Sequence, residues 1–235
     1  MRIGEVLSEA WSLYKRFFGR FFLTAFIVFA VLDLLAAAAE SASGDGWISG
    51  VFWGIVAAVV GVVGYFWVQA ALVATVDDVR DGRADRSIGE TYQAVRPQLL
   101  SATIGGILAA FGVGIGFLLL IIPGLYLLTI WSMLIPVIVL ERRSVGESFG
   151  RSQDIVRGNW WPVFGLILIT FVGAAIVSGL IQAAFSPLPD FLDSWLGSLV
   201  GDSITAPFAA AALATAYFHL RGQYQAVPAA EPTLS

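Results

Sequence analysis

Six apolar runs dominate this sequence, and each is long enough to cross a lipid bilayer as a helix. The runs lie at about 21–39, 48–75, 99–119, 121–140, 161–182 and 203–220. About 20 consecutive apolar residues span the hydrocarbon core of a bilayer. Lipid offers no partner for free backbone N–H and C=O groups, so each run must be a helix rather than a lone strand. The sequence therefore predicts an all-α integral membrane protein with six transmembrane helices.

The composition supports a membrane protein and excludes several kinds of site. Of the 235 residues, 58% are hydrophobic and 13% are charged, whereas soluble domains carry roughly 25% charged residues. The chain has no cysteine, which excludes disulfides, iron–sulfur clusters and cysteine-ligated zinc. Its net charge of −4 argues against a nucleic-acid partner, because proteins that bind nucleic acids present a basic face.

The third and fourth runs are nearly continuous from Leu99 to Leu140, which is about twice the length of one span. We expect this stretch to fold into a hairpin. The turn should lie between Phe117 and Tyr126, because Pro123-Gly124 is the strongest local helix breaker in the stretch.

The basic residues predict the orientation in the membrane. All thirteen lie in four clusters, which are Arg2, Lys15, Arg16 and Arg20; Arg80, Arg83, Arg86 and Arg96; Arg142, Arg143, Arg151 and Arg157; and Arg221. The alternate loops at about 40–47, 117–124 and 183–202 contain no basic residue. These loops carry acids instead, which are Glu40, Asp45, Asp190, Asp193 and Asp202. Positive residues stay on the cytoplasmic side, so six spans place both termini and both arginine-rich loops in the cytoplasm, whereas five or seven spans do not.

A cleaved signal peptide is the alternative interpretation of residues 1–42. The small residues Ala37, Ala38 and Ala39 fit the pattern of a cleavage site. However, the positive region is longer than in a signal peptide, and the apolar run is long enough to span a bilayer. We therefore expect this segment to be the first transmembrane helix.

An internal repeat is visible in three segments that begin alike, Ile3-Gly4-Glu5, Ile88-Gly89-Glu90 and Val145-Gly146-Glu147. Mostly apolar residues follow at +4, +7 and +11, the spacing of an amphipathic helix. They are Leu7, Ala10 and Tyr14; Tyr92, Val95 and Leu99; and Phe149, the polar Ser152, and Val156. Each helix precedes two apolar runs. The sequence thus predicts one domain over residues 1–221, with three repeats of an interfacial helix and a transmembrane hairpin at about 1–76, 87–140 and 144–221. A disordered cytoplasmic tail is expected at 222–235.

The glutamates of the repeat have a structural and a functional interpretation. Ser87 and Glu90, and likewise Ser144 and Glu147, have the Ser-x-x-Glu spacing of a capping box, which satisfies free N–H groups at a helix start. Helix capping is favoured over a functional set of acids. We expect the three helices to lie in the membrane interface, with their apolar faces toward acyl chains and their basic residues toward anionic headgroups.

Several segments resemble a large group of uncharacterised prokaryotic membrane proteins, which includes the membrane domain associated with glycerophosphoryl diester phosphodiesterases. The similar segments are 136–141 (PVIVLE), 144–152 (SVGESFGRS), 157–161 (RGNWW), the N-terminal helix, the helix at Ile88 and residues 217–221 (YFHLR). The resemblance covers most of the chain. In that family the phosphodiesterase chemistry belongs to a separate soluble barrel, which has no counterpart here. The resemblance implies a membrane module in a prokaryotic cytoplasmic membrane and does not imply an enzyme.

Three polar residues are candidates for function. Asp33 lies inside the first span, where an acid is costly and is by default a functional candidate; a side chain that reaches the outer interface is an equally good interpretation. Asp202 lies at the start of the last span, where it lines an outward-facing polar cavity or, as favoured, caps the helix. His219, near the cytoplasmic end of the last span, is a candidate pH sensor, although a histidine stabilised by the helix dipole is favoured.

Function is predicted only as a class. The chain shows no nucleophile–base pair, phosphate loop or paired-carboxylate site, so we expect no enzymatic activity, no cofactor and no metal. The leading hypothesis is a membrane module that organises lipids or partner proteins at its cytoplasmic face. The alternative is a small transporter or channel with a pathway near Asp33 and Asp202, and a membrane enzyme acting on lipids ranks third. The small-residue pairs Gly50/Gly54 and Gly112/Gly116 and the small-residue stretch Ala209–Ala216 are interpreted as packing sites within the bundle.

Overall fold

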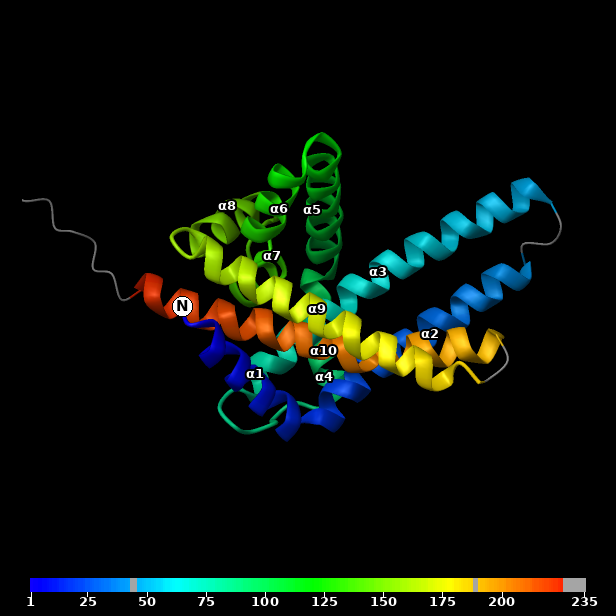
Figure 1. Ribbon diagram of the computed structural model, residues 1–235, viewed down its shortest axis with the longest axis horizontal. Coiled ribbons are helices and arrows are strands. Elements are labelled where there is room, and N and C mark those ends of the chain that lie inside the picture. Colours follow the sequence, from blue (N-terminus) through cyan, green and yellow to red (C-terminus); the bar gives the residue numbers. More distant parts are fainter. Residues whose placement is uncertain (43–45, 188–189, 226–235) are drawn as a thin grey trace, which may run out of the picture.

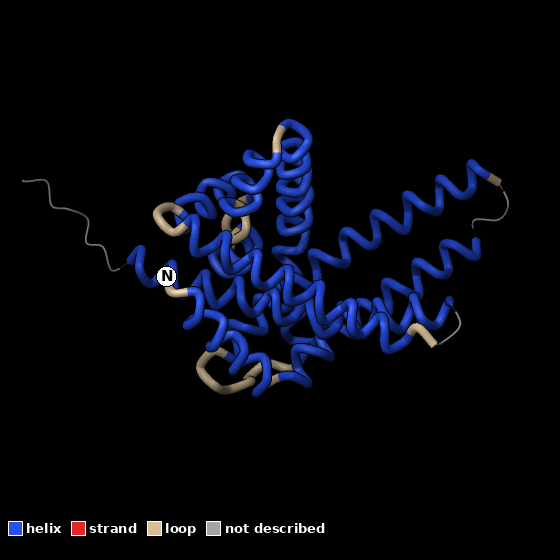
Figure 2. The backbone as a smooth tube through the Cα atoms, in the orientation of Figure 1, coloured by secondary structure: helices blue, strands red, loops and turns tan. Residues whose placement is uncertain are grey.

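The structure is a computed structural model that describes residues 1–42, 46–187 and 190–225, and every regular element in these ranges is helical (Figures 1 and 2). The elements are α1 (Ile3–Arg16), α2 (Phe18–Ala42), α3 (Trp47–Val79), α4 (Ile88–Val95), α5 (Leu99–Leu119), α6 (Ile121–Ile130), α7 (Leu134–Pro136), α8 (Val145–Val156), α9 (Trp160–Phe185) and α10 (Asp190–Gln225). A short 3-10 turn (Arg96–Gln98) joins α4 to α5, and a π-helical turn (Val137–Glu141) follows α7.

Six segments of the described chain are long and apolar enough to cross a membrane. They are Phe18–Leu35, Trp47–Val79, Ile88–Leu119, Ile121–Glu141, Trp160–Phe185 and Trp195–Gly222. The prediction of a six-span helical membrane protein is confirmed at this level. The spans pair as α2 with α3, α5 with α6 and α9 with α10. In Figure 1 these three hairpins diverge from one region of the molecule, with α5 and α6 pointing away from the other two.

Helix α10 forms the centre of the molecule. It packs against α9, α2, α1 and α3, and Ala210, Ala211, Ala212, Ala214 and Ala216 are all buried along it. Methyl-sized side chains let neighbouring backbones approach closely, which is how spans pack in lipid where burial from water contributes little. The small-residue stretch predicted to pack within the bundle does so here.

The α5–α6 turn lies within the predicted range of Phe117 to Tyr126, although it falls at Leu120 and not at Pro123-Gly124. The helix breaks at Leu120, whose backbone is extended, and Pro123 lies within the first turn of α6. Proline is tolerated there because the first N–H groups of a helix have no intrahelical acceptor. Gly116 and Gly124 face each other across the hairpin, and a Cβ on Gly116 would lie 2.9 Å from the Cα of Gly124. Glycine is needed at this contact.

The two predicted glycine pairs behave differently. A Cβ on Gly112 would meet the ring of Trp131, so Gly112 and Gly116 both mark close contacts inside the molecule. A Cβ on Gly50 or Gly54 would meet nothing within 4 Å. The prediction of packing within the bundle is therefore wrong for the first pair, because the outer half of α3 has no described neighbour on that face.

The fourth and sixth spans also depart from the sequence prediction. The fourth is interrupted between Ile130 and Leu134 and ends in a π-helical turn rather than running as one helix. Helix α10 begins at Asp190, so most of the loop predicted at 183–202 is helical. The same helix continues to Gln225, which makes residues 222–225 helical rather than part of a disordered tail. The rest of that predicted tail, 226–235, lies outside the described residues.

The three amphipathic helices pack on protein, not on acyl chains. Val6 of α1, Thr91 of α4 and Ser148 of α8 occupy the same +3 position of the repeat, and all three side chains are fully buried. Ala10 and Ser152, at +7, are buried as well. The expectation that these faces point toward lipid is wrong, because the spanning helices cover them. We call α1, α4 and α8 the base helices.

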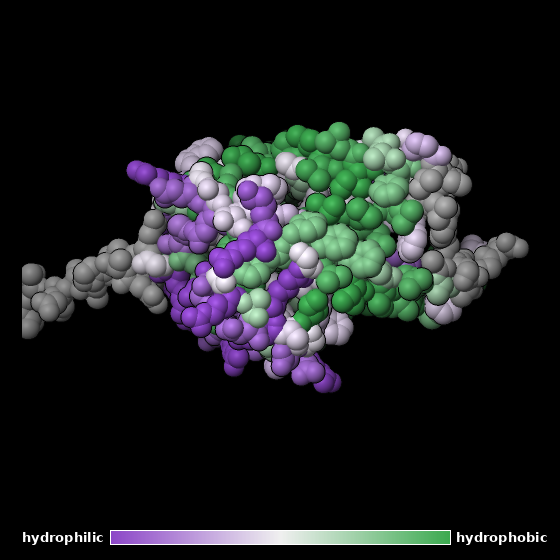
Figure 3. Space-filling model, turned by 90° about the horizontal axis from the view of Figure 1, so that it is seen from below, coloured by the Kyte–Doolittle hydropathy of each residue, from purple (hydrophilic) through white to green (hydrophobic). Residues whose placement is uncertain are grey.

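Polar and apolar surfaces separate on the molecule. In Figure 3 most of the strongly hydrophilic residues gather at one end, and hydrophobic residues cover most of the rest of the coloured surface. Leu118, Trp47 and Ile122 are among the most exposed hydrophobic residues, each more than three-quarters exposed. In water such a surface would be sticky, whereas in a bilayer it is the surface that lipid solvates.

Candidate functional site

A groove of about 630 Å³ with a mostly apolar lining lies between α1, α9 and α10. One wall comes from the end of α1 and the start of α2, through Trp11, Tyr14, Lys15 and Phe18. Of these side chains, Trp11 and Phe18 are more than two-fifths exposed. The groove therefore opens on the outside of the helix bundle, where lipid would be its solvent.

The opposite walls of the groove are built from small and apolar residues. Gly173, Ala174 and Val177 of α9 line one side, and Ile204, Thr205 and Phe208 of α10 line the other. A Cβ built on Gly173 would meet nothing within 4 Å, so the glycine leaves open space that a larger residue would occupy. The lining contains one charged side chain, that of Lys15.

Tyr14 lines the groove and links α1 to α10. Its hydroxyl donates a 2.9 Å hydrogen bond to the carbonyl oxygen of Ile204. Pro207 lies three residues further along α10. It has no N–H and makes no helical hydrogen bond to the carbonyl four residues before it, that of Ser203, which is the neighbour of Ile204. Burial raises the pKa of Tyr14 to about 12, so the hydroxyl stays protonated and remains a donor.

Each base helix donates a hydrogen bond from a side-chain hydroxyl to a backbone carbonyl of a spanning helix. Tyr92 of α4 donates to the carbonyl of Thr24 in α2 at 2.6 Å, and Ser152 of α8 donates to the carbonyl of Ile130 in α6 at 2.7 Å. Ser152 interrupts the apolar pattern in the sequence, and this bond explains its place on a buried face. A buried hydroxyl with a partner avoids the cost of an unsatisfied donor.

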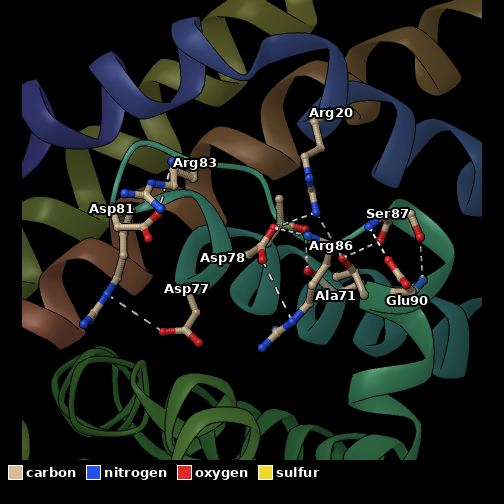
Figure 4. A network of polar contacts seen from close by, with 12 residues as sticks. Arg20, Ala71, Asp77, Asp78, Asp81, Arg83, Arg86, Ser87 and Glu90 are labelled. Atoms are coloured by element: carbon tan, nitrogen blue, oxygen red, sulfur yellow. Dashed lines mark hydrogen bonds and ion pairs between the residues drawn. The ribbon is translucent and has the colours of Figure 1, made fainter.

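A second polar network joins α2, α3 and α4 (Figure 4). Arg20 forms a 2.7 Å ion pair with Asp78, whose side chain is only 5% exposed, and Arg86 lies 3.9 Å from the other oxygen of the same carboxylate. The backbone N–H of Arg86 also donates to Asp78 at 3.3 Å. This network ties the start of the first span to the end of the second, and its geometry is that of a structural clamp.

A similar arrangement surrounds Glu141 at the end of the fourth span. Arg143 and Arg151 donate to its carboxylate at 2.7 and 3.1 Å, and the hydroxyl of Tyr217 in α10 donates at 3.0 Å. Sequence reasoning missed Asp78 and Glu141 as partners, because it used the arginines only to assign orientation. An acid at the end of an apolar run next to an arginine cluster is the signal that could have identified both.

The four residues predicted as helix caps lie at helix starts. The hydroxyl of Ser87 accepts from the N–H of Glu90 at 3.2 Å, and the N–H of Ser87 donates to the Glu90 carboxylate at 2.7 Å. At α8 the N–H and the hydroxyl of Ser144 both donate to Glu147, at 3.2 and 2.7 Å. In the first copy Arg2 replaces the serine and pairs with Glu5 at 3.1 Å.

The structure brings Asp33 and Asp202 within electrostatic range of each other, and Asp202 also acts on Tyr65 of α3. The prediction that Asp202 caps a helix is wrong, because α10 begins at Asp190 and Asp202 lies well inside it. Asp202 is exposed, while the adjacent Ser203 is fully buried. Asp33 of α2 and Tyr65 of α3 thus both lie within electrostatic range of Asp202 of α10.

His219 has a partner in the structure. Its Nε2 lies 2.7 Å from a carboxylate oxygen of Glu9 in α1. The sequence analysis did not identify this partner, because the contact depends on how α1 packs along α10. The contact joins the first base helix to the last span. Across the described ranges, no group of three or more His, Cys, Asp and Glu residues is placed to hold a metal ion.

The comparisons with known proteins identify a family and no individual relative. Neither a curated protein nor a solved structure matches the chain. A family model described as a domain of unknown function, DUF7847, matches residues 87–220. The matched part runs from the first capping serine to the last turns of α10, and it covers more than half of the 235 residues. The chain therefore belongs to the DUF7847 family.

Proposed function

We propose that this protein is a non-enzymatic integral membrane module that binds and organises membrane lipids. The observation that carries the proposal is the groove between α1, α9 and α10. Its apolar lining and lateral opening suit an acyl chain, because pockets that bind apolar ligands are concave, mostly apolar and contain few polar groups. The resemblance to the membrane domain associated with glycerophosphoryl diester phosphodiesterases supports a module of this kind, since the chemistry in that family lies in another domain.

The proposed architecture is three repeats, each with a base helix and a transmembrane hairpin, and with both termini in the cytoplasm of a prokaryotic cell. Two observations support it. The +3 position is buried in all three base helices, and the arginines that pair with Asp78 and Glu141 lie near those helices. Positive residues favour the cytoplasmic side, so the base helices belong there.

Filling the groove tests lipid binding. Ala174 lines the groove, whereas Ile176 is exposed on the same helix outside it. We expect Ala174→Val, Ala174→Leu and Ala174→Phe to reduce the phospholipid that remains bound after detergent extraction, in the order of side-chain size. Ile176→Phe is the matched control and should retain the wild-type amount. Intact-protein mass spectrometry measures the bound lipid, and thermal unfolding identifies variants that do not fold. A folded Ala174→Phe protein with full lipid occupancy would contradict the proposal.

A second candidate function is transport, favoured by the proximity of Asp33, Tyr65 and Asp202. Acids within a span mark ion or proton pathways in many transporters. On the lipid-binding proposal, Asp33→Asn and Asp202→Asn leave the protein level, lipid retention and complementation of a deletion strain close to wild type. Ion flux through the purified protein in liposomes, removed by either substitution, would favour transport instead.

A further inference from the structure

We propose that the groove between α1, α9 and α10 selects lipids with an anionic phosphate headgroup and that Lys15 binds that phosphate. This inference rests on the proposed lipid-binding function and adds the chemical class of the lipid. It starts from the composition of the lining, in which nine uncharged residues accompany a single lysine.

Lys15 lines the groove beside Trp11. It belongs to the last turn of α1, one residue before the helix ends. Its Nζ lies 5.5 Å from the centroid of the Trp11 ring, which lines the same groove. Tryptophan and lysine are the residues that anchor proteins at the level of lipid headgroups, because both combine an apolar body with a polar tip.

The charge of Lys15 is available to a ligand. No carboxylate of the described residues lies within 4.0 Å of its ammonium group, whereas Arg20, Arg86, Arg143 and Arg151 all have acidic partners. The stem of a lysine is flexible, and its ammonium is a compact point charge with three donors. A phosphate at the mouth of the groove would supply the missing partner.

Arg16, the next residue, has a different environment. Its guanidinium packs near Gly82 in the loop after α3 and lies 5.4 Å from the Phe17 ring. It does not line the groove. Of the two adjacent cations, Lys15 therefore faces the groove and Arg16 packs against the protein. Basic pockets between spans are known to hold anionic lipid headgroups.

The apolar lining of the groove beyond Lys15 suits the acyl chain of a lipid whose phosphate binds Lys15. From Lys15 the lining continues past Phe18 and Phe208 to Ala174 and Val177 in the middle of α9. A chain that enters beside Trp11 would lie on these apolar side chains. A neutral lipid would fill the groove equally well but leave Lys15 unpaired, so the headgroup, rather than the tail, determines the preference.

A competition experiment tests the headgroup. Nanodiscs with equal amounts of phosphatidylglycerol and phosphatidylcholine, carrying the same acyl chains, would be presented to the wild type, Lys15→Gln, Lys15→Arg and Arg16→Gln. Mass spectrometry of the released intact protein gives the ratio of the two bound lipids. We expect the wild type, Lys15→Arg and Arg16→Gln to prefer phosphatidylglycerol by about fivefold, the contribution expected of one lysine near the membrane surface. The preference should disappear in Lys15→Gln, with total bound lipid unchanged.

The possible results separate this inference from the proposed function. An unchanged preference in Lys15→Gln overturns the headgroup assignment while lipid binding stands. Equal loss of preference in Arg16→Gln also overturns it, because the effect would then be one of general surface charge. Displacement of bound phosphatidylglycerol by soluble glycerol 3-phosphate would assign the site to free phosphate esters. A change of oligomeric state in Ala174→Phe, with no change in lipid, would show that a second copy of the chain fills the groove and would overturn both proposals.

Discussion

The Tyr14 hydroxyl donates to the Ile204 carbonyl at 2.9 Å, which joins the first base helix to the last span beside Pro207. We predict that Tyr14→Phe lowers the free energy of unfolding by about 1 kcal/mol, the usual net contribution of one hydrogen bond. The ring stays in place, so the packing against Phe208 should be kept. Unfolding of the purified protein in mixed micelles measures the change. Tyr126→Phe is the control, since Tyr126 is nearly half exposed (46%), and an equal loss there would contradict the assignment.

Two glycines of α5 make a matched pair for the contact at the α5–α6 turn. A Cβ on Gly116 would lie 2.9 Å from the Gly124 backbone, whereas a Cβ on Gly114 would meet nothing within 4 Å. We predict that Gly116→Ala destabilises the protein, because backbone atoms cannot move aside cheaply. Gly114→Ala should be neutral or stabilise it by up to about 1 kcal/mol, the gain in helix propensity. Thermal unfolding in the same detergent compares the two, and similar melting temperatures would argue against the close approach.

The capping box of α8 predicts a dependence on pH. Hydrogen bonds from the hydroxyl and backbone N–H of Ser144 lower the pKa of Glu147. A carboxyl whose pKa is lower in the folded state stabilises that state above its unfolded pKa of about 4.3 and loses the contribution as the pH falls through the folded value. We therefore expect weaker protection of the amides at the start of α8 in acid than at pH 7, once the observed exchange rates are divided by the intrinsic rates at each pH.

Glu147→Gln tests the origin of that change. Glutamine can still close a capping box, so the helix should persist while the dependence on acid disappears. Hydrogen exchange with mass spectrometry, in peptides covering 145–150, gives the readout. If the acid effect survives in Glu147→Gln, another group is responsible.

The orientation is tested by cysteine labelling, which the absence of native cysteine simplifies. Ser186 follows α9 and is exposed, and Ser144 precedes α8 and is also exposed. With the base helices in the cytoplasm, a membrane-impermeant thiol reagent should label Ser186→Cys in intact cells and Ser144→Cys only after lysis. Labelling of Ser144→Cys in intact cells would contradict either the predicted orientation or the six-span arrangement.

The spans were predictable because each depends on a local property. Twenty apolar residues must form a helix in lipid whatever their neighbours are, and the predicted run at 99–119 coincides with α5. The capping residues were predictable for the same reason, since Ser87 and Glu90 lie within one turn of each other. Both are short-range features, which a single sequence contains in full.

The features that sequence reasoning missed depend on contacts between distant segments. The proximity of Asp33 to Asp202 and the hydrogen bond from Ser152 to Ile130 bring together residues from different helices. Hydropathy also placed the start of the last helix too late, because the polar residues around Asp190 and Asp193 lower the average in a segment that is still helical. The groove beside Lys15 requires the relative positions of three helices, which no spacing in the sequence contains.

The burial of α1 has a consequence for biosynthesis. Val6, Ala10 and Tyr14 are covered largely by α10. Helix α1 is synthesised first, and α10, its main packing partner, begins only at Asp190. Until the last hairpin enters the membrane, the apolar face of α1 has no permanent partner and must rest on the bilayer or on an assembly factor. A chain truncated before α10 would leave that face without its main partner.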